Sequence, residues 1–116
     1  YAGDKRMIGN IVTMTEFGQV IGYENHSGMT ILSDKRQAFG TVIKGDGNNG
    51  KDNTEGAVYK NVYGSYMHGS LLPKNPIFTD MLIEKALTKR YGHFEPQVID
   101  DRFADQARAI ARERPR

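Results

Sequence analysis

His68 is the residue whose setting in this sequence best suits chemistry. It lies in residues 64–76, which read G-S-Y-M-H-G-S-L-L-P-K-N-P and link an apolar run to a helix. An imidazole can take up and return a proton near neutral pH, and α/β proteins place such groups where a strand ends. The pattern also fits a histidine that only hydrogen-bonds at a strand end. His68 is therefore a candidate general acid–base.

The remaining histidines give weaker signals. His26 lies in residues 25–28, N-H-S-G, a small polar cluster whose amide and hydroxyl groups could bond the backbone or a ligand. His93 follows the end of a helix and is interpreted as loop structure. None of the three histidines has metal-pair spacing to another, which disfavours a metal site. The sequence contains no cysteine, so it offers no disulfide, no zinc–thiolate site and no thiol nucleophile.

Residues 45–56, G-D-G-N-N-G-K-D-N-T-E-G, form a polar segment with three possible functions. A calcium loop counted from Asp46 would need an oxygen ligand at its fifth position and Gly at its sixth, where the chain has Gly50 and Lys51. A phosphate-binding loop would need Gly-Lys-Ser/Thr before an apolar helix, and Gly50-Lys51-Asp52 opens none. We therefore expect an exposed hairpin loop held by Asx turns.

Short runs of β-branched and apolar residues predict strands on both sides of this loop. They cover residues 7–14, 19–24 and 39–44, and the polar cluster at 25–28 is expected to end the second strand. Residues 58–67, V-Y-K-N-V-Y-G-S-Y-M, carry apolar residues on both faces near their end. That pattern is typical of a strand covered on both sides.

Two helices are predicted after His68. The first has Asn75 as a good N-cap, Pro76 at its first position and Gly92 as a left-handed stop. Its apolar residues recur at helical spacing and form one face: Ile77, Phe78, Met81, Leu82, Ala86 and Leu87. The second helix runs from residue 100 or 101 to 114. Its apolar face is smaller: Phe103, Ala107, Ile110 and Ala111. We expect this helix to pack loosely or to need a partner.

Length and composition indicate one globular domain. The chain has 116 residues, of which 38% are hydrophobic and 26% charged. A formal net charge of +2 gives no support for nucleic-acid binding. No apolar run approaches the roughly 20 residues of a membrane helix and no signal peptide is visible, so a cytoplasmic location is expected. Because the chain begins at Tyr1 within what reads as ordered sequence, we suspect a fragment.

Three motifs in one order resemble the class I glutamine amidotransferases of the cobyric-acid-synthase type. They are G-Y-E-N-H-S-G-M-T at residues 22–30, G-N-N-G at 47–50, and the motif at 64–76. The resemblance extends from about residue 6 to residue 90 and is greatest to the glutaminase subunits of lipid II isoglutaminyl synthases. It implies an α/β, flavodoxin-like fold whose mostly parallel sheet is accompanied by helices and a hairpin. The sequence patterns alone fit an α+β fold nearly as well.

The resemblance also implies hydrolysis of the side-chain amide of glutamine. In this family a Cys thiolate attacks the amide carbon, a glutamyl thioester forms, and ammonia passes to a synthase. His68 matches the family's catalytic His, which takes the thiol proton and returns one to the departing ammonia. Many relatives have H-P-E at this motif, with the Glu orienting the His. Ser70 stands at the Glu position here, so a Cys-His dyad is implied.

The implied substrate-binding residues lie earlier in the chain. Asn25, His26 and Ser27 resemble the stretch with which the family holds the amino and carboxylate ends of glutamine. Arg6 matches a basic position that also serves the substrate, and a guanidinium suits a carboxylate. A surface charge at a strand edge is the simpler interpretation of Arg6.

The family's nucleophilic Cys has no counterpart in these 116 residues. We expect residues 1–116 to be the C-terminal part of an amidotransferase domain, completed by a separate Cys-bearing N-terminal half, or else a degenerate form. Alone, the chain is expected to be inactive. The implied partner is a Mur-ligase-like synthase subunit, in a heterodimer that amidates the glutamate of lipid II, and no cofactor is implied. The alternatives are the glutaminase region of a cobyric-acid-type synthase and a non-catalytic partner-binding domain.

Overall fold

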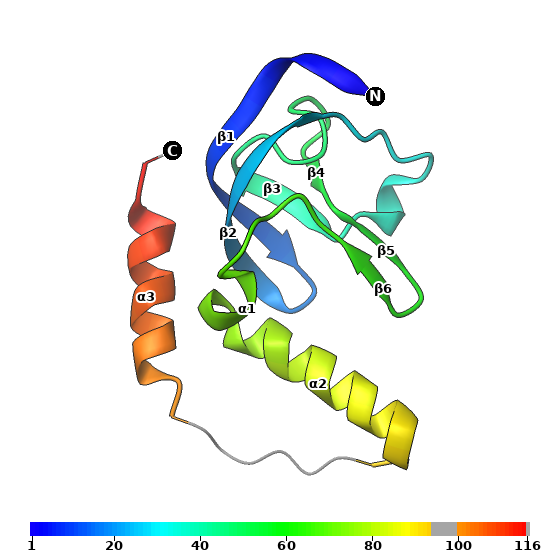
Figure 1. Cartoon of the computed structure of the whole chain (residues 1–116), viewed down its shortest axis with the longest axis vertical. Helices are drawn as coiled ribbons and strands as arrows, with labels where there is room; N and C mark the ends of the chain where they lie inside the picture. The colour runs from blue at the N-terminus through cyan, green and yellow to red at the C-terminus, as the bar shows by residue number, and fades with distance from the viewer. Residues whose placement is uncertain (94–99, 116) are drawn as a thin grey trace.

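The computed structural model describes residues 1–93 and 100–115 (Figure 1). Its main sheet has four strands in the order β2-β1-β3-β4, and a second sheet pairs β5 with β6. Three α-helices follow the strands, and a short 3-10 helix, η1, precedes β3. The bounds are β1 Ala2–Thr15, β2 Gly18–Gly28, η1 Lys35–Gln37, β3 Gly40–Lys44, β4 Thr54–Glu55, β5 Ala57–Tyr59, β6 Val62–Gly64, α1 Leu71–Lys74, α2 Pro76–Tyr91 and α3 Arg102–Glu113.

The expectation of a mostly parallel, flavodoxin-like sheet is wrong for the part of the chain that the structure describes. Every pairing between its strands is antiparallel. The connections explain this, because Thr15 at the end of β1 and Gly18 at the start of β2 are separated by two residues. A parallel pair needs a crossover of about a dozen residues or more. The observed order, in which the strands precede the three α-helices, corresponds to the α+β fold that the sequence patterns fitted nearly as well.

β1 and β2 form a hairpin that is longer than predicted. Small polar residues were expected to end the second strand at residue 25, but β2 continues to Gly28. The reason is a long partner strand, because His26 pairs with Met7 and Asn25 pairs with Ile8. The main-chain ladder of β1 therefore overrides the turn preference of these residues.

The core lies on one face of the main sheet. It consists of Ile11, Val20, Phe39, Met67 and Phe78. The Phe78 ring lies 5.1 Å from the Phe39 ring and 5.9 Å from the Tyr63 ring, so α2 is fixed to the sheet by aromatic contacts. Val12 and Ile21 are also buried and, as sequence neighbours of Ile11 and Val20, point to the other face.

α2 has the predicted bounds, but most of its predicted apolar face is exposed. Phe78 is its one buried residue among those described, and Ile77 is 69% exposed. The short helix α1, which the sequence patterns did not predict, precedes it directly. Asn75 therefore lies between two helices, and its side chain bonds to Ile21 of β2 instead of capping α2.

α3 is also confirmed, and it lies against β1 and β2 at the side of the molecule opposite β5 and β6 (Figure 1). Polar groups make the contacts: Arg108 donates to the Gln19 carbonyl, and the Lys44 ammonium donates to the Arg112 carbonyl at 3.0 Å. Phe103 is 73% and Ile110 57% exposed. The predicted apolar face of α3 thus points largely to solvent.

One strand expectation and one loop expectation also need correction. Residues 58–67 do not form one strand, because Lys60 turns the chain at φ 54° between β5 and β6. Residues 45–56 are not simply exposed, since Asn48 and Asn49 are buried and the segment contains β4.

Within the described residues, none of the helices is long and apolar enough to cross a membrane.

Candidate functional site

His68 lies beside the free edge of the main sheet, which is strand β2. The segment before it pairs with that edge through a bridge between Met67 and Glu24, and the His68 N–H donates to the Tyr23 carbonyl at 2.8 Å. After His68 the chain turns through Gly69 and Ser70, whose φ of 65° is left-handed, and enters α1. The expected short link into a helix is therefore present.

The imidazole of His68 is exposed and has one hydrogen bond to the sheet edge. Its Nε2 lies 3.2 Å from the carbonyl oxygen of Asn25. A carbonyl oxygen only accepts, so this nitrogen carries the hydrogen. In the neutral ring Nδ1 then keeps its lone pair, which makes Nδ1 the basic atom of the site. The Asn25 backbone carbonyl thus fixes the orientation of the His68 ring. Ser70, which stands where the H-P-E motif has an orienting Glu, has no carboxylate for this purpose.

Asn25 also contacts Arg6. The Arg6 Nε donates to the Asn25 side-chain oxygen at 2.6 Å. Both side chains come from the β1–β2 hairpin, whose register brings Met7 opposite His26. The structure therefore brings together three of the predicted site residues, with Asn25 between the guanidinium and the imidazole.

In an edge strand such as β2, the N–H and C=O groups of every second residue point away from the sheet. These groups need hydrogen-bond partners outside the main sheet. The Ile21 N–H and C=O bond to the Asn75 side chain, at 2.8 Å each. The Tyr23 carbonyl accepts from the His68 backbone, and the Asn25 carbonyl accepts from the His68 ring. His68 and Asn75 together cover this edge, which is how the fold positions the candidate site.

His26 points to the interior, away from the His68 imidazole. Its Nδ1 lies 2.8 Å from the Gly28 carbonyl, and its ring stacks on Tyr66 at 3.8 Å between centroids. Nε2 lies 3.7 Å from a carboxylate oxygen of Glu24. Ser27, the last predicted site residue, is half-buried on β2.

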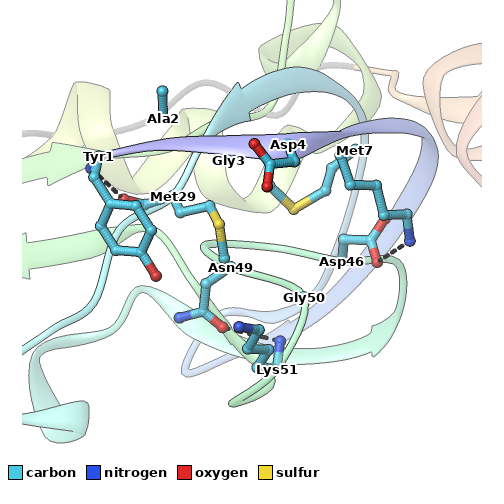
Figure 2. A pocket seen from close by; sticks show the side chains of 11 residues that line it. Tyr1, Ala2, Gly3, Asp4, Met7, Met29, Asp46, Asn49, Gly50 and Lys51 are labelled. Atoms are coloured by element: carbon cyan, nitrogen blue, oxygen red, sulfur yellow. Dashed lines mark hydrogen bonds and ion pairs between the residues drawn. The ribbon is translucent and has the colours of Figure 1, made fainter.

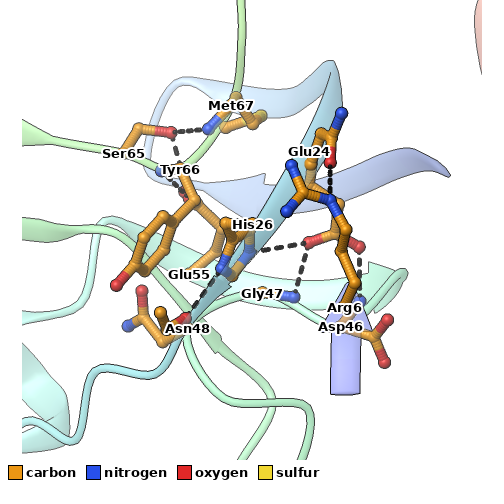
Figure 3. Close-up of polar contacts among 12 residues, drawn as sticks. Arg6, Glu24, His26, Asp46, Gly47, Asn48, Glu55, Ser65, Tyr66 and Met67 are labelled. Carbon is orange, nitrogen blue, oxygen red and sulfur yellow. Dashed lines mark hydrogen bonds and ion pairs between the residues drawn. The ribbon is translucent and has the colours of Figure 1, made fainter. Parts of the chain in front are cut away.

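Two buried carboxylates, Glu24 and Glu55, accompany His26 (Figure 3). Glu24 accepts the backbone N–H groups of Asp46 at 2.8 Å and Gly47 at 2.9 Å. Burial raises the pKa of Glu55 above its ordinary value, and hydrogen bonds from Tyr66 and Ser65 oppose the rise. Sequence reasoning missed both residues. The one available signal was a Glu within the predicted strand 19–24.

The predicted Asx turns hold the segment 45–56. The side-chain oxygen of Asn49 accepts from the N–H groups of Lys51 and Asp52, at 2.9 and 3.1 Å. The buried amide of Asn48 bonds both the N–H and the C=O of Gly56. Among the described residues there is no group of three or more His, Cys, Asp or Glu that could hold a metal ion. This segment is therefore interpreted as structural.

A pocket of about 380 Å³ lies between the start of β1 and the segment 45–56 (Figure 2). Residues from Tyr1 to Lys5 form one wall, and Asn49, Gly50 and Lys51 form the other. None of the predicted site residues lines it. The candidate site at His68 is therefore exposed at a sheet edge and is separate from this pocket.

Comparison with known proteins agrees with the motifs. The CobB/CobQ-like glutamine amidotransferase domain matches residues 1–76. The subunit GatD of lipid II isoglutaminyl synthase (glutamine-hydrolyzing) from Staphylococcus aureus is 43% identical over 109 residues, covering 90% of this chain and 43% of the relative. The same subunit of Streptococcus pneumoniae is 44% identical over 91 residues, covering 77% of this chain and 35% of the relative.

A third relative is a probable cobyric acid synthase of Methanothermobacter thermautotrophicus. It is 33% identical over 106 residues, which cover 89% of this chain and 20% of the relative. The chain thus spans less than half the length of these three curated relatives. The matched residues contain the whole of the sheet, the His68 segment and Asn75. The chain belongs to the family of CobB/CobQ-like glutamine amidotransferase domains.

Proposed function

We propose that the chain is the His-bearing part of a glutaminase that supplies ammonia for the amidation of lipid II. The observation that supports this proposal is the placement of His68, Asn25 and Arg6 at one sheet edge, with the His68 Nδ1 left as a base. The similarity to the two GatD subunits supports lipid II as the acceptor, because both belong to lipid II isoglutaminyl synthases.

In the proposed reaction a Cys thiol from a separate N-terminal half gives its proton to the Nδ1 of His68. The thiolate attacks the amide carbon of glutamine, and His68 returns the proton to the departing ammonia. Water then hydrolyses the glutamyl thioester. No orienting carboxylate is needed in this dyad, because the Asn25 carbonyl holds the imidazole through Nε2.

The glutamine would be held by the residues that surround the imidazole. The Nε of Arg6 is bonded to Asn25, which leaves its two terminal nitrogens to bind the substrate carboxylate. The Asn25 side-chain oxygen, which has a second lone pair beside the bond from Arg6, would accept from the amino end. Because the His26 ring is buried, His26 and Ser27 would contribute through the backbone of β2.

The proposed assembly is a heterodimer in the cytoplasm, with a Mur-ligase-like synthase subunit that uses the ammonia. Residues 1–116 would be the C-terminal part of the amidotransferase domain and would be inactive alone, because they contain no thiol. The test is ammonia release from glutamine by this chain alone and after a Cys-bearing N-terminal half and the synthase are added. The proposal is supported if ammonia is released only when this chain and the Cys-bearing N-terminal half are both present.

Two other functions have distinguishable consequences. The glutaminase region of a cobyric-acid-type synthase is favoured by the 33% identity to a probable cobyric acid synthase, and a corrinoid would then be the acceptor. A non-catalytic partner-binding domain would bind the synthase and release no ammonia in any combination. Supplying lipid II or a corrinoid acid to the assembled proteins, and measuring which acceptor is amidated, separates the lipid II proposal from the cobyric-acid-type alternative.

A further inference from the structure

The β1–β2 hairpin has an outer face, on the side of the main sheet away from the core. Alternate residues of the two strands form this face in four cross-strand pairs, which are Ile8–Asn25, Asn10–Tyr23, Val12–Ile21 and Met14–Gln19. The neighbouring residues Ile11 and Val20 belong to the core on the opposite face. The outer face thus consists of these eight residues.

None of the eight side chains of the outer face is charged, although 26% of the chain is charged. The solvated face of an antiparallel sheet is usually polar. Here, however, Ile8 is 49%, Met14 45% and Tyr23 38% exposed. Exposed apolar residues on an uncharged face are typical of the centre of a protein–protein interface. The lack of positive charge fits neither nucleic acid nor an anionic lipid surface.

α3 covers only the middle of the outer face, where Val12 and Ile21 are buried. Polar bonds to the pairs on either side fix the helix. The Asn10 side chain donates to a carbonyl just after α3, at 2.9 Å, and Arg108 of α3 donates to the Gln19 carbonyl. None of the α3 residues, all of which the structure describes, is buried. Both ends of the outer face therefore stay exposed.

The side of α3 that meets the sheet is not its apolar one. Its half-buried residues are Ala104, Arg108 and Ala111, whose spacing places them on one face of the helix. Phe103 and Ile110 each lie one position earlier, about 100° around the helix axis, and are exposed. α3 therefore leaves its own apolar side chains open as well, on a helix that crosses the outer face.

One end of the outer face is continuous with the candidate site. Asn25 belongs to this end, and its carbonyl holds the His68 imidazole at 3.2 Å. Ile8 is the cross-strand partner of Asn25, and Tyr23 lies two residues away on the same face, about 7 Å along the strand. A thiol that exchanges a proton with the His68 Nδ1 must come within about 3 Å of it. A polypeptide that carries such a thiol would therefore lie next to Ile8 and Tyr23.

We propose that the outer face is the surface on which the Cys-bearing half of the amidotransferase domain docks, with Ile8 and Tyr23 in the contact beside His68. The inference rests on the proposed function, from which it takes the partner. A second copy of this chain contains no cysteine and could not bring a thiol to His68. The relatives are long enough to contain such a partner. The matched 109 residues are 43% of the Staphylococcus aureus subunit, so more than half of that relative lies outside the match.

The test measures binding apart from catalysis, by using the Cys-bearing half with its thiol carboxamidomethylated. Isothermal titration calorimetry gives its dissociation constant for the native chain and for the variants Ile8→Lys and Tyr23→Lys. Both side chains are exposed, so these variants should fold, which circular dichroism checks. We expect each variant to bind at least roughly tenfold more weakly, because an unpaired charge is costly at the centre of an interface.

Tyr59→Lys is the matched control, because Tyr59 is exposed on β5 and lies outside the outer face. This variant should bind as tightly as the native chain. In the native chain, which needs no substitution, amide resonances of residues 8–14 and 19–25 should shift on binding more than those of 57–64. Unchanged affinity in Ile8→Lys and Tyr23→Lys, shifts confined to residues 57–64, or no binding would overturn the proposal. A dimer of the native chain that Ile8→Lys dissociates would also overturn it, because a second copy would then occupy the face.

Failure of this interface and failure of the proposed function give different results. If the alkylated half binds elsewhere while the unmodified assembly releases ammonia from glutamine, the interface alone is wrong. If the alkylated half binds at the outer face but the unmodified assembly releases no ammonia, the proposed function is wrong and the interface stands.

Discussion

Asn75 should be one of the most sensitive positions for stability, although its side chain does not cap α2. Its amide pairs with both backbone groups of Ile21, at 2.8 Å each, and also donates to the Leu71 carbonyl at 2.7 Å. Ile21 is 1% exposed, so water cannot replace these bonds. Asn75→Ala would leave two buried backbone groups without partners. At about 1–3 kcal/mol for each, the free energy of unfolding should fall by about 2–6 kcal/mol.

Urea unfolding followed by circular dichroism at 25 °C measures this loss. Asn61→Ala is the matched control, because Asn61 lies in the exposed turn between β5 and β6. The control should lose less than about 0.5 kcal/mol, as surface substitutions usually do. A loss below about 1 kcal/mol for Asn75→Ala would refute the reasoning, since it would mean that the edge of β2 at Ile21 needs no partner.

Three further predictions concern the segment that carries His68, the protonation of Glu55 and the packing of α3 on the sheet. Gly22→Ala should cost about 1–3 kcal/mol of unfolding free energy, because a Cβ there would lie 2.5 Å from the Met67 sulfur, and shifted resonances of residues 65–68 would locate the strain. Stability should fall as pH rises above 4.5 toward the raised pKa of Glu55, since the folded state keeps a proton that the unfolded chain releases. Urea midpoints between pH 4.5 and 8 should show this decline in the native chain but not in Glu55→Gln, and equal declines would contradict it. Lys44→Ala should increase hydrogen exchange in α3 while leaving α2 unchanged, because Lys44 bonds the Arg112 carbonyl of α3 and the Arg114 carbonyl just after it; unchanged exchange in α3 would contradict this role.

The parts of the fold that the sequence predicted well have local signals. Pro76 and Gly92 delimit α2, and the structure has this helix at Pro76–Tyr91. Alternating and β-branched residues located β1 and β2 with shorter bounds than the structure has, and β3 to within one residue. These signals depend on residues close in the chain, so no knowledge of the tertiary structure is needed to interpret them.

The expectations that failed depend on contacts between distant residues. The end of β2 follows from a register with β1 that no local pattern in residues 25–28 specifies. The parallel sheet was implied by resemblance to whole amidotransferase domains, whereas this chain spans less than half of its relatives. Asn75 looked like a helix cap because its partner Ile21 lies 54 residues away.

The candidate site shows the same division. His68 was found from its motif, and Arg6 and Asn25 were found from the resemblance; their mutual contacts required the β1–β2 hairpin and the return of the chain along β2. Glu24 and Glu55 gave almost no signal, because a buried carboxylate and a surface carboxylate are identical in sequence. The fold alone shows that both are buried behind the His68 segment.

The central claim is that the His68 imidazole transfers the proton in glutamine hydrolysis. The most direct test is ammonia release from glutamine by the assembly of this chain, a Cys-bearing N-terminal half and the synthase subunit, using His68→Ala. The account predicts a loss of about 10²–10⁴-fold, the usual contribution of a general acid–base, while His93→Ala at an exposed position retains the native rate. Ammonia release that is unchanged by His68→Ala would contradict the account.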